Sequence, residues 1–329
     1  MGRALIGLAF GLAVLAGPAA AEDVALTFDD LPTMALSPTT DYASATTERL
    51  LAGLRRHHIP AIGFVNESKL EAPDKPQRIA LLKAWLDAGM DLGNHTYSHP
   101  HFSTDAAAEI ADTARGEVVT RALLAKRHRA PHWFRHPFLE TGATEAARKT
   151  FEAWLAAHGY RVAPVSMENS DWLFALPYDE AVLKGETAEA ARIRKAYLDF
   201  TAQVVPWYRQ AALDVLGRRP KFIFLMHATR LNADSIDALA EILSANDLKP
   251  VTLAGAMTDP AYVMAEDGTG ANGDQWVSRW ATTLKKPMPW STLPRPPADI
   301  AAIDARLEGA AGPPAAPARP GSQSVRPSS

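Results

Sequence analysis

The chain has 329 residues, 47% of them apolar, which is enough for one large domain with a full core. Its formal net charge is -3 and it has no run of Lys or Arg, so a basic surface for nucleic acid or anionic membranes is excluded. It has no cysteine, so the fold must rest on its core without disulfides, and a lipidated N-terminal cysteine is impossible.

Residues 1–21 have the pattern of a secretory signal peptide: one early Arg, an apolar run, and small residues before Glu22. The alternative is a membrane anchor. The apolar run over residues 4–16 is short for a membrane-spanning helix, which favours cleavage. We therefore expect an exported protein, periplasmic or secreted, with no stable membrane insertion after cleavage.

Short apolar runs alternate with helical patterns from residue 22 to about residue 258. We expect seven strands, at 24–28, 61–65, 90–94, 132–135, 160–165, 221–226 and 251–253. Helical patterns lie between them, at 41–58, 79–86, 103–126, 147–155, about 179–216 and 236–243. Regular alternation of this kind predicts an α/β fold with a parallel sheet and favours a closed or nearly closed barrel. No Gly-rich phosphate loop follows any strand, which argues against nucleotide binding.

The C-terminal part changes character. Residues 260–290 contain Trp276, Trp280 and Trp290 with little regular pattern before Gln275. These tryptophans could line a sugar-binding surface, but packing against the main domain is favoured. We expect a signal peptide at 1–21, a main domain at 22–258, an extension packing on it at 259–308, and a disordered Pro/Ala/Ser-rich tail at 309–329.

Polar residues follow several of the expected strands. Asp29 and Asp30 come after the first strand, and His95 and His99 come after the third. Alone, each pair has a plain explanation, as acids in a surface turn or as histidines on a helix surface. Two histidines four residues apart can also bind one metal together with a carboxylate such as Asp30.

Three further residues lie in matching places. Arg135 ends the fourth strand, Asp171 follows the fifth, and His227 ends the sixth. Taken singly, they would be a surface charge, a helix cap and a packed histidine. In a parallel barrel, however, the carboxyl ends of all strands form one rim, where active sites lie. The convergence of all these residues on one rim outweighs the separate explanations.

Five segments in this order resemble the motifs of the polysaccharide deacetylases with the NodB-homology domain (carbohydrate esterase family 4), over roughly residues 24–255. They are Thr27–Asp30, His95–His99 (H-[ST]-x-x-H), Arg135–Phe138 (R-x-P-[YF]), Asp171–Trp172, and Leu225–His227 (L-x-H). The resemblance implies a distorted (β/α)7 barrel, which agrees with the strand count. It also makes residues 22–258 the catalytic domain.

The resemblance also implies roles. Asp30, His95 and His99 would bind Zn²⁺ or another divalent metal such as Co²⁺, Mn²⁺ or Ni²⁺. Asp29 would be the general base, oriented by Arg135.

Opposite them, His227 would be the general acid, tuned by Asp171. The Phe138 backbone N–H would help to hold the oxyanion, and Trp172 would form a wall of the site.

The implied activity is removal of N-acetyl groups from a glycan: peptidoglycan, a chitin-like polymer or poly-N-acetylglucosamine. Hydrolysis of an acetyl ester or a small cyclic amide, or non-catalytic glycan binding, are the alternatives. The sequence departs from the family pattern at Leu31, where many members have Gly, and at Glu168, where an Asp is common. The segment Asp179–Leu216 and the residues after Pro260 are also outside the family's core pattern.

Overall fold

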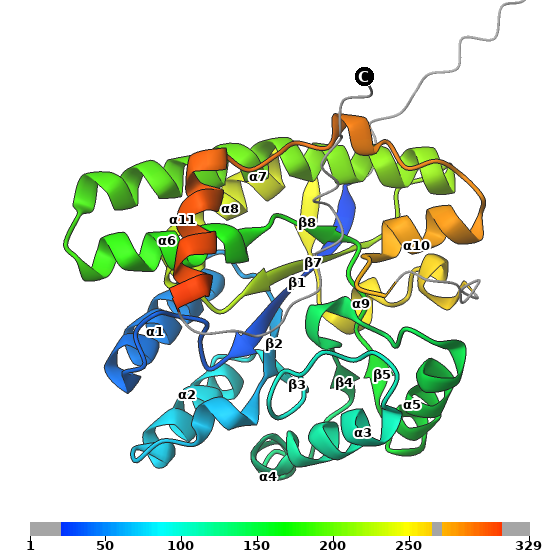
Figure 1. Cartoon of the computed structure of the whole chain (residues 1–329), viewed down its shortest axis with the longest axis horizontal. Coiled ribbons are helices and arrows are strands. Elements are labelled where there is room, and N and C mark those ends of the chain that lie inside the picture. Colours follow the sequence, from blue (N-terminus) through cyan, green and yellow to red (C-terminus); the bar gives the residue numbers. More distant parts are fainter. Residues whose placement is uncertain (1–20, 265–271, 311–329) are drawn as a thin grey trace, which may run out of the picture.

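The computed structural model describes residues 21–264 and 272–310. Residues 1–20 of the expected signal peptide and residues 311–329 of the expected tail lie outside the described residues. In the described part, helices surround a parallel sheet (Figure 1). None of the described helices is both long and apolar enough to cross a membrane.

Strand β1 (Glu22–Leu31) is the centre of the sheet. It pairs in parallel with β2 (Ala61–Val65), β7 (Phe222–His227) and, at its start, β8 (Leu248–Pro250). The remaining strands are β3 (Asp91–Asn94), β4 (Trp133–Phe134), β5 (Arg161–Val162) and β6 (Met167–Glu168). The order along the sheet is β5-β4-β3-β2-β1-β7-β6, and every pairing is parallel. This arrangement confirms the predicted fold class.

The register brings the polar strand ends together. Asp29 at the end of β1 lies opposite His227 at the end of β7. Asn94 at the end of β3 lies opposite Phe134 at the end of β4, so His95 and Arg135 follow side by side. Because parallel strands end at the same edge, four of these chain segments open onto one rim.

The helices that cover the strands occupy the outside of the sheet in Figure 1. They are α1 (Thr40–Arg56), α2 (Lys75–Asp87), α3 (Ala106–Arg115), α4 (Val118–Ala125), α5 (Glu145–Ala157), α6 (Asp171–Leu183), α7 (Thr187–Leu216), α8 (Arg230–Ala245) and the short α9 (Leu253–Ala256). Short 3-10 helices lie at η1 (Glu67–Leu70), η2 (Pro137–Leu139) and η3 (Pro260–Val263).

Two helical predictions need correction. The helix expected over residues 103–126 is divided into α3 and α4 at Gly116. A Cβ at Gly116 would lie 2.4 Å from the carbonyl carbon of Thr96 and 2.5 Å from the nitrogen of Tyr97. The turn between α3 and α4 therefore packs directly against the backbone of Thr96 and Tyr97 and leaves no room for a side chain. The segment expected over 179–216 is two helices, α6 and α7, because Gly185 adopts a left-handed conformation (φ 73°) and reverses the chain.

Two strand predictions also need correction, and one observed strand is not predicted. The fifth strand is shorter than expected, because Pro164 has no N–H to continue the ladder beyond the bond from Ala163 N to the Phe134 carbonyl. Strand β6 was missed, since two residues carry no alternation. The strand expected at 251–253 is wrong: Pro250 ends the pairing with β1, and Thr252 caps α9 instead.

The C-terminal residues pack on the main body. Helix α10 (Trp276–Thr283) packs on α7, and α11 (Ala298–Ala310) packs on α6. Trp276, Trp280 and Ile300 belong to the same hydrophobic core as β1 and β7. Trp290 of η4 (Trp290–Thr292) is 49% exposed and stacks on Trp207 of α7. Helix α11 ends at Ala310 and so includes Gly309 and Ala310 of the tail expected at 309–329.

Candidate active site

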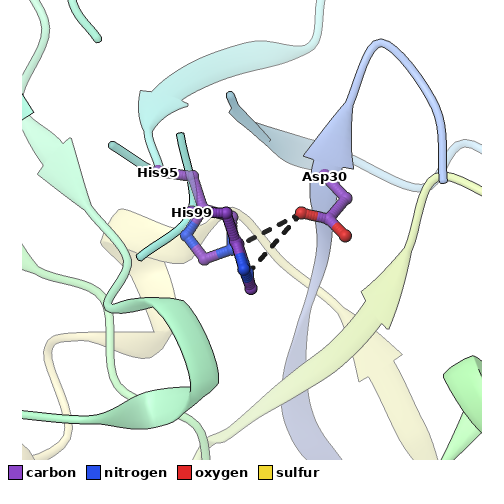
Figure 2. A group of neighbouring side chains, drawn as sticks. All are labelled: Asp30, His95 and His99. Carbon is purple, nitrogen blue, oxygen red and sulfur yellow. Dashed lines mark ion pairs between the residues drawn. The ribbon is translucent and has the colours of Figure 1, made fainter. Parts of the chain in front are cut away.

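Asp30, His95 and His99 form the centre of the candidate site. Asp30 is the next-to-last residue of β1, and both histidines come from the segment after β3, with their rings turned toward the Asp30 carboxylate (Figure 2). Asp30 Oδ1 lies 3.9 Å from His95 Nε2 and 3.7 Å from His99 Nε2. One ligand atom from each residue lies within 4.8 Å of the others. Asp30 Oδ1 is buried and has no hydrogen-bond partner, as expected of an oxygen placed to bind a cation. One carboxylate and two imidazoles suit catalytic zinc with an open position.

The local backbone makes this meeting possible. Asp30, Thr96 and His99 have φ of 70°, 66° and 58°, in the left-handed region. Thr96 Oγ1 accepts a hydrogen bond from His99 N (3.0 Å), and Thr96 N donates to Asn94 Oδ1 (2.8 Å). These bonds close one turn of chain, so both histidines face the same point. Such backbone conformations are costly outside glycine and concentrate at functional sites.

The ligands are held in the protonation states that metal binding needs. His95 Nδ1 lies 2.7 Å from the Arg135 carbonyl, to which it donates, leaving Nε2 free to bind a metal. Burial lowers the pKa of His95 well below its usual value, so the ring is neutral. Burial alone would raise the pKa of Asp30, but Lys69 and His99 outweigh it and lower the pKa, so the carboxylate is ionised.

Asp29 lies beside this centre and is 2% exposed. Its Oδ2 is 3.4 Å from Arg135 Nη1 and 3.6 Å from His95 Nε2, while its Oδ1 has no partner. Burial raises the pKa of Asp29 to about 6, against the opposing charge of Arg135. A carboxylate that exchanges its proton near neutrality can act as a general base.

Arg135 is fully buried and held from several sides. Its Nε donates to the Ala163 carbonyl (2.8 Å), and its Nη2 donates to Thr27 Oγ1 (3.0 Å). Its guanidinium also lies 4.8 Å from the centre of the Phe64 ring. A buried cation fixed this firmly can orient only one carboxylate, and that carboxylate is Asp29.

His227 and Asp171 form a second polar pair. His227 Nδ1 lies 2.8 Å from Asp171 Oδ1, and His227 N donates to Asp171 Oδ2 (2.7 Å). Burial lowers the pKa of His227, but the charge and hydrogen bond of Asp171 outweigh it and raise the pKa to about 9. His227 therefore carries a proton at neutral pH.

The remaining two site candidates occupy the rim. Phe138 has φ 52° and is 38% exposed. The centre of its ring lies 4.4 Å from the centre of the His99 ring and 3.9 Å from that of the His101 ring, on which it stacks. Trp172 follows Asp171 at the start of α6 and is half-buried. The oxyanion role of the Phe138 N–H and the wall formed by Trp172 stay predictions.

Some residues around the site carry no sequence signal that would have singled them out. Lys69 Nζ lies 3.4 Å from Asp30 Oδ2, and Asn232 Nδ2 lies 2.5 Å from Asp171 Oδ2. Both contacts join residues far apart in the chain. Lys69 also lines a surface depression of about 610 Å³ together with Thr39, Thr40, Ser68, Asp74 and Arg78.

Comparison with known families agrees with the resemblance seen in the sequence motifs. Residues 16–163 match the model of the polysaccharide deacetylase family. The match confirms the resemblance to this family. It contains the first three of the five motifs, those at Thr27–Asp30, His95–His99 and Arg135–Phe138.

Two curated relatives of the deacetylase-like region have modest identity. A peptidoglycan-N-acetylglucosamine deacetylase from Bacillus cereus is 27% identical over 159 residues, covering 47% of this chain and 48% of the relative. A chitin deacetylase from Colletotrichum lindemuthianum is 28% identical over 153 residues, covering 45% and 52%. The chain thus matches about half the length of each. The solved family 4 carbohydrate esterase from Streptomyces lividans, in complex with acetate, is 22% identical with a TM-score of 0.45, covering 71% of this chain and 95% of that one.

Proposed function

We propose that this protein is a metal-dependent hydrolase that removes N-acetyl groups from an acetylated polysaccharide or oligosaccharide. One observation carries the proposal: the unpartnered Asp30 Oδ1 faces two histidine rings, with the buried Asp29–Arg135 pair beside it. His227, which pairs with Asp171, ends the neighbouring strand β7 in register with Asp29. A metal site, a base and an acid on one rim are the parts that amide hydrolysis requires.

In this proposal Asp30, His95 and His99 would hold Zn²⁺ or another divalent ion such as Co²⁺, Mn²⁺ or Ni²⁺. The ion supplies Lewis-acid chemistry for the acetyl carbonyl and for the attacking water. Asp29 accepts the proton of that water, and Arg135 keeps the carboxylate in place.

On the other side, His227 donates its proton to the nitrogen of the leaving amine, and Asp171 holds its ring. The Phe138 N–H supports the oxyanion and Trp172 borders the acyl group. An amine leaves poorly without a proton, so His227 with its raised pKa suits this role.

The family resemblance supports the substrate class that we propose. The two curated relatives are named for peptidoglycan and chitin, both polymers of N-acetylated sugars. We further propose export after cleavage before Glu22, and a catalytic domain at 22–258 on which residues 259–308 pack.

Acetate release from a panel of N-acetylated and O-acetylated glycans tests the proposal, with zinc-loaded and chelator-treated protein compared side by side. Metal-dependent release from an N-acetylated glycan is the expected result, and it identifies the substrate class. Faster release from acetyl esters would make the protein an esterase. Absence of release from every glycan by the zinc-loaded protein would refute the proposal, leaving a small cyclic amide as substrate or a glycan-binding role.

A further inference from the structure

A chain of buried hydrogen bonds connects helix α7 to the candidate general acid. Asn169 Nδ2 donates to the hydroxyl of Tyr197 (2.8 Å), which donates to Asn232 Oδ1 (2.6 Å). Asn232 Nδ2 then donates to Asp171 Oδ2 (2.5 Å), and Asp171 Oδ1 lies 2.8 Å from His227 Nδ1. Asn169, Tyr197 and Asn232 are each fully buried, and Asp171 is 1% exposed.

The direction of every bond in this chain is fixed. Asn232 Nδ2 also donates to the His227 carbonyl (2.9 Å), so both of its amide hydrogens point at acceptor oxygens. The amide oxygen Oδ1 therefore faces Tyr197 and can only accept. Tyr197 must therefore donate. Burial and the charge of Asp171 raise the pKa of Tyr197 well above its usual value, so its proton stays available for that bond.

We propose that Asn232 and Tyr197 are positioning residues that hold the Asp171 carboxylate, and through it the ring of His227, in the orientation needed for proton donation. The inference rests on the proposed function. It also gives α7 a role, because this helix lies in the segment that falls outside the family's core pattern.

The physical reason is the number of donors around one carboxylate. Asp171 accepts from the Asn232 amide, from the His227 backbone and from the His227 ring. Without the Asn232 amide, the Asp171 carboxylate keeps only its two bonds to His227 and is held less firmly. Without the Tyr197 hydroxyl, Asn232 Oδ1 is left unpaired in a buried place, so the amide that bonds Asp171 is anchored on one side only.

The variants Asn232→Leu and Tyr197→Phe test this, with Tyr208→Phe as the matched control. Tyr208 is also a buried tyrosine of α7, but its hydroxyl donates to Glu168 Oε1 (3.1 Å) and has no bond to Asn232 or Asp171. Each of the three variants removes one buried hydrogen-bonding group, so all three should have a lower thermal unfolding temperature than the wild-type protein. Only the first two should affect His227.

Two readouts are needed on the full chain loaded with zinc. NMR titration of the histidine rings, with His227 assigned by the signal lost in His227→Gln, should show its pKa falling toward the ordinary range of histidine. The groups that face His227 are Asp171 of α6 and Asp29 and Asp30 of β1, and all are retained in these variants. Release of acetate should fall about tenfold in kcat/KM, the size of one hydrogen bond to a charged group, and its decline with rising pH should begin at lower pH.

An unchanged His227 titration and an unchanged pH profile in both variants, with only stability lowered as in Tyr208→Phe, would overturn the inference. If Asn232→Leu does not fold, Tyr197→Phe decides alone. If the wild-type chain releases no acetate, the proposed function fails, while the NMR titration still tests the positioning of His227.

Discussion

At the scale of single residues, the candidate general base Asp29 combines a buried cationic partner, Arg135, with an unpaired carboxylate oxygen. Arg135 makes Asp29 tolerable in the core, while Asp29 Oδ1 has no partner. A buried oxygen without a partner is costly, and it is explained if a water molecule gives it a proton during turnover. The unpaired Oδ1 of Asp29 thus lowers the stability of the fold but leaves an oxygen free to accept a proton in the reaction.

We therefore expect Asp29→Asn to lower kcat by roughly 10²–10⁴-fold, the usual contribution of a general base, while zinc binding stays within a few-fold. Acetate release and isothermal titration with zinc measure the two effects. Asp237→Asn is the control, since Asp237 is an exposed acid paired with Arg56 and His57. Normal turnover by Asp29→Asn would remove Asp29 from the base role.

The pH profile tests His227. A general acid must be protonated, and the pKa of His227 is raised to about 9. Turnover should therefore be lost as the pH rises through about 9, with the acid form intact below it. In Asp171→Asn the main group that raises this pKa is neutral, so the loss should move to lower pH. A profile that is the same in both proteins would exclude His227 as the acid.

The sequence predicts the chemical residues better than the residues that hold them. Asp29, Asp30, His95 and His227 stand directly after apolar runs, so the strand pattern alone puts them on one rim. Tyr197 stands inside a helical pattern and Asn232 stands before one, and neither has a distinguishing spacing. Their importance comes from contacts across 61 and 35 residues of chain, which only the packed structure creates.

At the scale of elements, Gly116 ties the α3–α4 turn to the metal-binding segment. A Cβ at this position would meet the backbone of Thr96 and Tyr97, between the two histidines. Gly116→Ala should therefore lower the free energy of unfolding by ~1–3 kcal/mol through overpacking and also weaken zinc binding.

Gly53→Ala is the matched control, because a Cβ there would lie 2.0 Å from Ile236 Cγ2, away from the metal site. It should lower stability by a similar amount with zinc affinity unchanged. Urea unfolding and zinc titration measure both quantities. Equal zinc affinity in the two variants would show that the metal segment does not depend on this contact.

Elements defined by long apolar runs were predictable, and short ones were not. Strands β1, β2, β3 and β7 lie where the apolar runs predict them. Strand β6 and the paired part of β5 have two residues each, and their register comes from their neighbours. The division at Gly116 was equally hidden, because its cause is the backbone of a segment some twenty residues away in the chain.

At the scale of the whole molecule, α11 packs on α6, the helix that begins with Asp171. Ile300 is fully buried in the main core, whereas Arg306 pairs with Glu180 at the surface. Ile300→Ala should lower the free energy of unfolding by ~2–5 kcal/mol, and Arg306→Ala by less than ~1 kcal/mol. Chemical denaturation followed by tryptophan fluorescence measures both changes. We expect a single cooperative transition in each variant. A separate early transition would mean that residues 259–308 unfold on their own.

The central position of β1 has a consequence for how the chain reaches this structure. Its first neighbour, β2, is synthesised soon afterwards, but its other neighbours begin at Phe222 and Leu248. During synthesis, one edge of β1 therefore stays unpaired until about two hundred further residues have been made. Such distant pairings make folding slow and leave apolar edges open in the meantime. The metal-binding half and the proton-donating half of the rim are joined only at that late step, so partly made chains hold no assembled site.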